Sequence, residues 1–204
     1  MVSSLKNKNT KILKDPILDF LPRGETNFVI LGTMASYVAR EIDGTVNNNS
    51  FYYHDGRNRF WGVLSYLLTG KEISFRSISE KKDFLNKYGV ALANLVSTIE
   101  VDSAVGTSSD RVLFKAFGDG KLEFKKASPE MISLIRQKPV FFTCYRKPKI
   151  DTLLDGYNEF NKIFDERIVN RITFLHSPTR RGHQHIAEKW RDIIRMSYPS
   201  LLGL

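Results

Sequence analysis

One segment of the sequence, Phe51–Trp61, carries the densest set of side chains able to do chemistry. It holds two tyrosines, a histidine, an aspartate, an asparagine and two arginines, directly before a run with helical spacing. Aromatic rings beside cations are typical of a platform on which a nucleic-acid base stacks. Asn58 could instead cap the following helix, and Tyr53 could simply pack against it. Phe60 and Trp61 fit the core of that helix better than a ligand contact.

A second polar segment, His176–His185, follows an apolar run and leads into a helical pattern. Its hydroxyls, its turn proline and its paired arginines suit contacts with phosphate groups, helped by the amino end of the following helix. A zinc site built from His176, His183 and His185 is the alternative. No carboxylate stands at metal-ligand spacing, and His183 and His185 are not one helical turn apart. We therefore expect no metal.

A third segment, Leu31–Ser36, turns out of an apolar run through small residues. Small side chains at such a turn let a ligand approach the backbone closely. Taken alone, the segment is better interpreted as an ordinary turn between a strand and a helix. The sequence has no phosphate-binding P-loop, no Gly-rich dinucleotide fingerprint and no serine-hydrolase elbow. We therefore expect no cofactor.

Strands and helices must position these three segments. Apolar runs predict strands over residues 27–31, 140–145 and 171–175, and a further strand or a buried extended segment over residues 90–96. Helical spacing and capping residues predict helices over residues 58–69, 79–87, 128–137, 150–164 and 185–196. Strands separated by helices predict an α/β fold, a three-layer α/β/α sandwich with a central, mainly parallel four-stranded sheet. In such sheets ligands bind at the carboxyl ends of the strands, where two of the three segments begin.

The length and the distribution of charge suggest one folded unit after a short leader. Residues 1–14 are rich in lysine and asparagine, and we expect them to form a flexible basic lead-in. Residues 15–204 show no repeat and no clear linker, which predicts a single domain.

The composition favours a polyanionic partner. The chain has 31 lysine and arginine residues against 22 aspartate and glutamate residues, a net charge of +9. Charge alone leaves open a basic protein with no such partner. Cys144 is the only cysteine, which excludes a disulfide within the chain and suits a reducing compartment. The sequence begins without the apolar core of a signal peptide and has no membrane-spanning run. We expect a cytoplasmic or nucleoid-associated monomer.

Taken in order, these segments resemble the uracil-DNA glycosylase superfamily over about residues 26–195. The family's Gly-x-x-x-Gly/Ser turn is matched by Gly32-Thr-Met-Ala-Ser36, and its aromatic segment ending in Asn-x-Phe-Trp is matched by Tyr52–Trp61. The Arg-Asn-x-Phe-Trp form resembles the deoxyinosine (hypoxanthine) branch most, with the mismatch-specific thymine/uracil branch beside it. Weaker similarities are Tyr88-Gly-Val-Ala-Leu, Gly106-Thr-Ser-Ser-Asp110 and His176-Ser-Pro-Thr179.

The resemblance implies a monofunctional DNA glycosylase that flips out a base of the uracil or hypoxanthine type and hydrolyses its glycosidic bond. Asn58, or the backbone of residues 33–35, would orient the water, and Asp55 would act as general base. His176 would stabilise the leaving base, and Tyr53 would stack on it. The other substrate-binding positions are Gly32, Thr33, Met34, His54 and Ser177, and the DNA-binding positions are Arg57, Thr179, Arg180 and Arg181. No lysine stands at a Schiff-base position, so we expect no strand cleavage.

Departures from the family pattern keep two alternatives open. Met34 stands where the mismatch-specific branch has its water-positioning asparagine, which leaves Asn58 for that role. Asp55-Gly56 replaces the usual His-Pro, and the loop over residues 37–50 is longer than in the family. One alternative is a glycosylase for a bulky, virus-type modified pyrimidine that serves antiviral defence. The other is a catalytically silent nucleic-acid-binding module with the same fold.

Overall fold

A parallel sheet of four strands, in the order β3-β2-β6-β7, forms the centre of the molecule. The computed structural model describes residues 10–15, 17–34, 51–52, 59–102, 110–143, 148–178 and 182–203. The four strands are β2 (Phe28–Gly32), β3 (Val90–Asn94), β6 (Val140–Phe142) and β7 (Ile172–Phe174). Every residue of β2 is buried, as expected for an inner strand covered on both faces.

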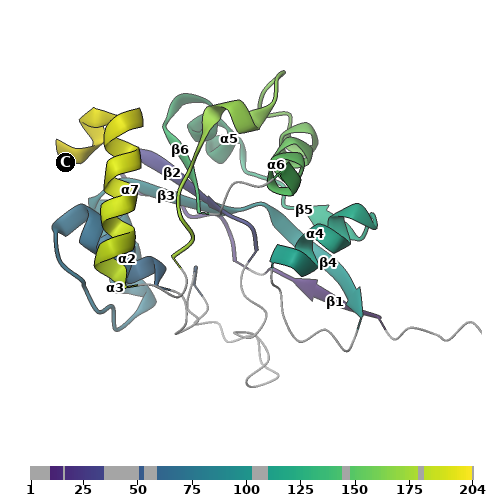
Figure 1. Ribbon diagram of the computed structural model, residues 1–204, viewed down its shortest axis with the longest axis horizontal. Coiled ribbons are helices and arrows are strands. Elements are labelled where there is room, and N and C mark those ends of the chain that lie inside the picture. Colours follow the sequence, from purple (N-terminus) through teal and green to yellow (C-terminus); the bar gives the residue numbers. More distant parts are fainter. Residues whose placement is uncertain are drawn as a thin grey trace, which may run out of the picture.

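Helices cover both faces of this sheet (Figure 1). One face carries α2 (Phe60–Thr69), α3 (Ile78–Lys87) and α7 (His183–Ser197), and the other carries α5 (Pro129–Gln137) and α6 (Pro148–Asn161). The side chains of β2 alternate between two apolar clusters. Phe28 and Ile30 belong to the cluster on the α2 side, and Val29 and Leu31 belong to the cluster on the α5 side. Short 3₁₀ helices, η1 (Ile168–Arg171) and η2 (Pro199–Gly203), complete the layers. The predicted three-layer α/β/α class is confirmed.

The helix ends follow the capping residues in the sequence. The Ser128 hydroxyl accepts a hydrogen bond from the backbone N–H of Met131 at 3.1 Å, and Pro129 opens α5 behind it. Gly70 ends α2 with a φ of 75°, a left-handed conformation that favours glycine. The predicted start of α5 and end of α2 are confirmed.

A second sheet, which the sequence patterns did not predict, lies beside the first. It consists of β1 (Thr10–Lys14), β4 (Val96–Asp102) and β5 (Leu122–Phe124), all antiparallel in the order β1-β4-β5. Helix α4 (Asp110–Gly118) packs against this sheet. The leader expected over residues 1–14 is therefore corrected at its end, because residues 10–14 pair with β4 along their whole length.

A local irregularity explains why β4 has no clear strand pattern in the sequence. The pairing of β4 with β5 shifts register between Val96 and Thr98. The buried residues of β4 are consequently Val96, Ile99 and Val101, which break the alternation by twos that marks a half-buried strand. In the part of the chain that the structure describes, no helix is long and apolar enough to cross a membrane.

Candidate active site

The candidate site lies at the carboxyl ends of the four parallel strands, which are side by side. Gly32 at the end of β2 pairs in register with Asn94 at the end of β3. The chain continues this pairing beyond the strands, since the N–H of Leu95 donates to the Gly32 carbonyl and that of Val96 to the Thr33 carbonyl, both at 3.0 Å. On the other side, the N–H of Thr143 donates to the Leu31 carbonyl at 3.2 Å. This is the edge at which such sheets bind ligands.

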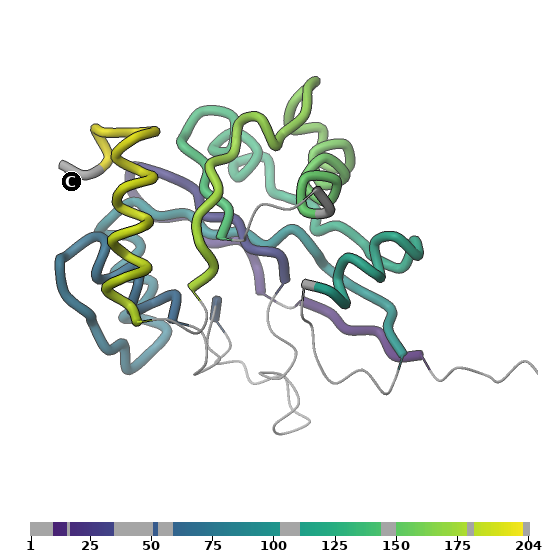
Figure 2. The backbone as a smooth tube through the Cα atoms, in the orientation of Figure 1, coloured from purple at the N-terminus to yellow at the C-terminus, as the bar shows by residue number. Residues whose placement is uncertain are grey.

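One hydrogen bond joins the two segments that the sequence singled out. The backbone N–H of Arg59 donates to the carbonyl of Pro178 at 3.0 Å. Arg59 closes the aromatic segment, and Pro178 belongs to the segment that leaves β7. The chain after β7 and the first turn of α7 lie at the same end of the molecule (Figure 2). Residues more than a hundred positions apart in the sequence therefore meet at the carboxyl edge of the sheet.

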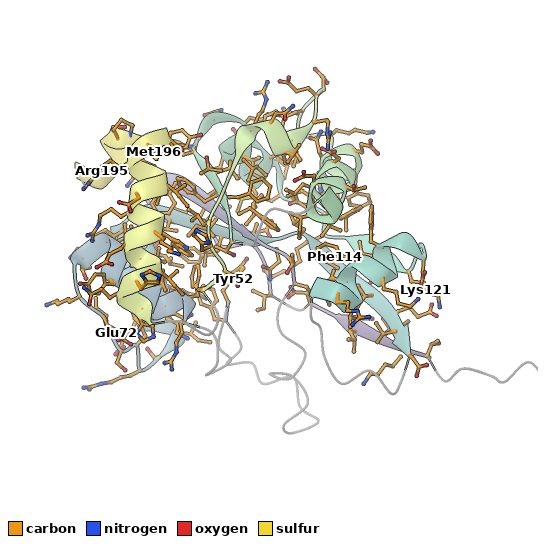
Figure 3. All side chains as sticks on the ribbon, in the orientation of Figure 1. Tyr52, Glu72, Phe114, Lys121, Arg195 and Met196 are labelled. Carbon is orange, nitrogen blue, oxygen red and sulfur yellow. The ribbon has the colours of Figure 1, made fainter. Side chains whose placement is uncertain are left out.

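The packing of α2 against α7 supports this junction. A Cβ atom on Gly62 would lie 2.7 Å from Cδ2 of His183, so only glycine lets the histidine ring cross α2 this closely. The Nδ1 atom of His183 lies 2.7 Å from Oε2 of Glu72. Glu72 lies just beyond α2, at the outer end of this helical layer (Figure 3). The first turn of α7 is thus held against α2.

Both tryptophans of the chain hold the backbone of the candidate segments. The indole N–H of Trp61 donates to the Tyr52 carbonyl at 2.7 Å, and that of Trp190 donates to the His176 carbonyl at 2.8 Å. Phe60 and Trp190 are fully buried, and Trp61 is nearly so. The prediction that Phe60 and Trp61 belong to the core is confirmed. Their contribution is to fix the backbone next to the residues predicted to do chemistry.

Aromatic packing continues into the start of the Phe51–Trp61 segment. Tyr52 lies inside the molecule, and its hydroxyl oxygen is 2.9 Å from the carbonyl oxygens of both Leu18 and Leu92 (Figure 3). The ammonium groups of Lys81 and Lys82 lie 5.0 Å and 5.5 Å from the ring centres of Trp61 and Phe51. Burial lowers the pKa of Lys81. The ammonium groups of two lysines of α3 therefore lie over the rings of Trp61 and Phe51 in this segment.

The structure describes five of the predicted site residues. Gly32, Thr33 and Met34 lie at the carboxyl end of β2, and Met34 is partly buried against the apolar cluster on the α5 side. His176 and Ser177 are partly buried after β7. These two groups lie at the same edge of the sheet. The remaining predicted residues lie outside the described residues: Tyr53, His54, Asp55, Arg57, Asn58, Thr179, Arg180 and Arg181.

Asn94 belongs to the candidate site and was missed by the sequence reasoning. It is 4% exposed at the carboxyl end of β3, and its Nδ2 donates to Oδ2 of Asp15 at 2.7 Å. A buried carboxamide at a ligand-binding edge offers both a donor and an acceptor to a ligand. The sequence contains one feature that could have identified Asn94: an asparagine ends the apolar run Val90–Ala93, at a position where packing alone favours another apolar residue.

The described residues gather no group of three histidine, cysteine, aspartate or glutamate side chains that could hold a metal ion. His183, one of the histidines considered as a zinc ligand, pairs with Glu72. His185 is exposed on the first turn of α7.

Comparison with known proteins identifies a relative in fold. A solution NMR structure of a putative uracil DNA glycosylase from Methanosarcina acetivorans matches this chain with a TM-score of 0.51 and 14% sequence identity. The match covers 90% of this chain and 99% of the other. No protein-family model and no curated protein matches the sequence. At this identity the comparison establishes a shared fold: the chain has the α/β architecture of that glycosylase-like protein.

Proposed function

We propose that this chain is a monofunctional DNA glycosylase of the uracil-DNA glycosylase superfamily that excises a deaminated or otherwise altered base. The observation that carries the proposal is the hydrogen bond between Arg59 and Pro178. It ties the aromatic segment to the His-Ser-Pro segment at the carboxyl edge of the sheet, the edge at which Asn94 ends β3. The fold shared with a protein named as a putative uracil DNA glycosylase and the net charge of +9 support the same function.

The chemistry of base excision matches the side chains that we propose for this edge. The enzyme must hold a base outside the DNA stack, stabilise an oxocarbenium-like sugar and accept the charge that develops on the leaving base. Tyr53 would stack on the base, and Asn94 would hydrogen-bond its edge. His176 would donate a hydrogen bond to the leaving base, where the negative charge develops.

The hydrolytic step assigns the remaining roles. A water oriented by Asn58 bonds through its oxygen to C1′ of the sugar, and the bond from C1′ to the base nitrogen breaks with its electron pair leaving on the base. Asp55 takes the proton from the water, and the base regains a proton from solvent. The products are an abasic site and a free base. The sequence resemblance to the deoxyinosine branch favours hypoxanthine and uracil as the bases.

A panel of labelled duplexes tests the proposal. Each duplex carries one uracil, hypoxanthine or bulky modified pyrimidine, and hot alkali after incubation cuts the strand only where the base has been removed. We expect cutting at uracil or hypoxanthine. Asn58→Ala should reduce it at least about a hundredfold, while Asn170→Ala, the same change at an exposed position on η1, should leave it intact.

Other outcomes of the panel would identify a different function. Cutting only at the bulky pyrimidine would indicate a defence enzyme with the same chemistry, supported at present by the long loop and by Asp55-Gly56. Binding of duplexes with no cutting on any of them would contradict the proposal and favour a silent binding module.

A further inference from the structure

A buried carboxylate stands directly behind Asn94. The side chain of Asp15 is fully buried, and its Oδ2 accepts the hydrogen bond from Nδ2 of Asn94 at 2.7 Å. Its Oδ1 accepts from the backbone N–H of Ile17 at 2.9 Å and lies 3.8 Å from Nζ of Lys125. Burying a carboxylate is costly unless it is paired and hydrogen-bonded, and these partners satisfy it.

Both members of this ion pair, Asp15 and Lys125, are positioned by strands of the second sheet. Asp15 directly follows β1, and Lys125 directly follows β5. The backbone N–H of Lys125 donates to the Leu95 carbonyl at 2.7 Å, and its ammonium group donates to the Ile17 carbonyl. The backbone N–H of Asp15 donates to the Ser97 carbonyl at 2.7 Å. The ends of β1 and β5 thus meet the start of β4 beside Asn94.

We propose that Asp15 is a positioning residue that fixes the orientation of the Asn94 amide and thereby sets which bases the site accepts. This inference rests on the proposed function. A carboxylate can only accept hydrogen bonds, so Asn94 must direct Nδ2 towards it. Rotation of the amide by half a turn would place Oδ1 against Oδ2 of Asp15, without a hydrogen bond. Asn94 therefore presents one arrangement of donor and acceptor, not two.

A fixed amide matters because deamination reverses the hydrogen-bonding edge of a base. Uracil and hypoxanthine present an N–H donor beside a carbonyl acceptor, whereas cytosine and adenine present a ring-nitrogen acceptor beside an amino donor. An amide free to rotate could pair with either edge. An amide held in one orientation pairs fully with one of them and leaves polar groups unpaired against the other, which is how a hydrogen-bonding site discriminates strongly.

Asp15→Asn is the informative variant because it keeps the shape but replaces an acceptor by an amide that can donate or accept. The measurement is binding to duplexes carrying 2′-fluoro-deoxyuridine or 2′-fluoro-deoxycytidine, which resist excision. We expect Asp15→Asn to lower the preference for the uracil duplex about tenfold, the equivalent of one hydrogen bond. Asp155→Asn on α6, where Oδ2 pairs with Arg167 at 2.7 Å, is the matched control and should keep the preference.

An NMR measurement on the wild-type protein gives a second readout. It tests the hydrogen bond of the Asn94 amide without any substitution and without base excision, and so separates this inference from the proposed function. The side-chain amide of Asn94, assigned by triple-resonance NMR, should give one downfield pair of signals protected from exchange with water. Rapid exchange of the Asn94 amide protons in the wild type would overturn the positioning role. An unchanged preference for the uracil duplex in Asp15→Asn would overturn it too, even if the amide signals are protected. A wild type that binds and discriminates the duplexes but excises no base would contradict the proposed function alone.

Discussion

The carboxyl of Asp19, which is affected by the charges of Asp15 and Lys125, allows a quantitative prediction of how the stability of the fold depends on pH. Burial raises the pKa of its carboxyl from 3.8 to about 6, and the charge of Asp15 acts in the same direction. The charge of Lys125 and a hydrogen bond from the Ser128 backbone act in the opposite direction. Among the described residues, Oδ1 of Asp19 has no hydrogen-bond partner. The ionised form is therefore poorly stabilised in the folded protein.

The sign of the pH dependence follows from this direction. Because the folded-state pKa is raised above the unfolded value, the native protein binds the proton more tightly, and the free energy of unfolding falls as pH rises from about 4 to about 6. A rise from 3.8 to about 6 corresponds to about 3 kcal/mol at most. Partial exposure of Asp19 reduces this, so we expect about 1–3 kcal/mol.

Asp19→Asn removes the ionisation and nearly preserves the shape. We expect the variant to exceed the wild type in free energy of unfolding by about 1–3 kcal/mol at pH 7.5, with the difference nearly gone at pH 4. Urea denaturation followed by circular dichroism at both pH values measures it. Asp83→Asn, the same change on the exposed side of α3, should alter stability by no more than about 0.5 kcal/mol. A variant less stable than the wild type at pH 7.5, or a gain that persists at pH 4, would refute this reasoning.

Other predictions concern the packing that supports the site. Gly62→Ala should destabilise the fold by about 1–3 kcal/mol in urea denaturation, despite the better helix propensity of alanine, because the added Cβ meets the ring of His183; a more stable variant would show that the ring moves away freely. Combining it with His183→Ala should restore part of the loss. Trp190→Phe removes the hydrogen bond to the His176 carbonyl, and we expect a loss of about 1–3 kcal/mol together with slower base excision; unchanged excision would mean that this bond does not position the segment. Raising the salt concentration should weaken duplex binding steeply in a filter-binding assay, because the proposed function requires lysine and arginine side chains to contact DNA phosphates; a flat response would argue against a phosphate-binding surface.

The central sheet could be predicted because its strands are short apolar runs that need no knowledge of their neighbours. Phe28–Leu31 and Val140–Phe142 are buried on both faces, so their composition alone marks them. Serine and glycine caps likewise act locally, and the predicted boundaries at Ser128 and Gly70 are confirmed. Such features are encoded within a few residues of the element that they define.

The second sheet and the partner of Asn94 could not be predicted in this way. β5 has three residues, β4 contains a register shift, and β1 lies in a lysine-rich stretch, so none shows a clean alternation. The hydrogen bond between Asp15 and Asn94 joins residues 79 positions apart, and it arises only once β1 and β3 are in place. The contact of Arg59 with Pro178 depends in the same way on how α2 and α7 pack.

Release of a free base is the most direct test of the central claim that the carboxyl edge of the sheet excises a base from DNA. The protein in excess over a duplex containing uracil or hypoxanthine should release that base in a single turnover, detected by mass spectrometry together with an uncut strand carrying an abasic site. Asn94→Ala should slow the release at least about tenfold, while Asn170→Ala should not. Bound duplex from which no base is released, or release that is unchanged in Asn94→Ala, would contradict the account.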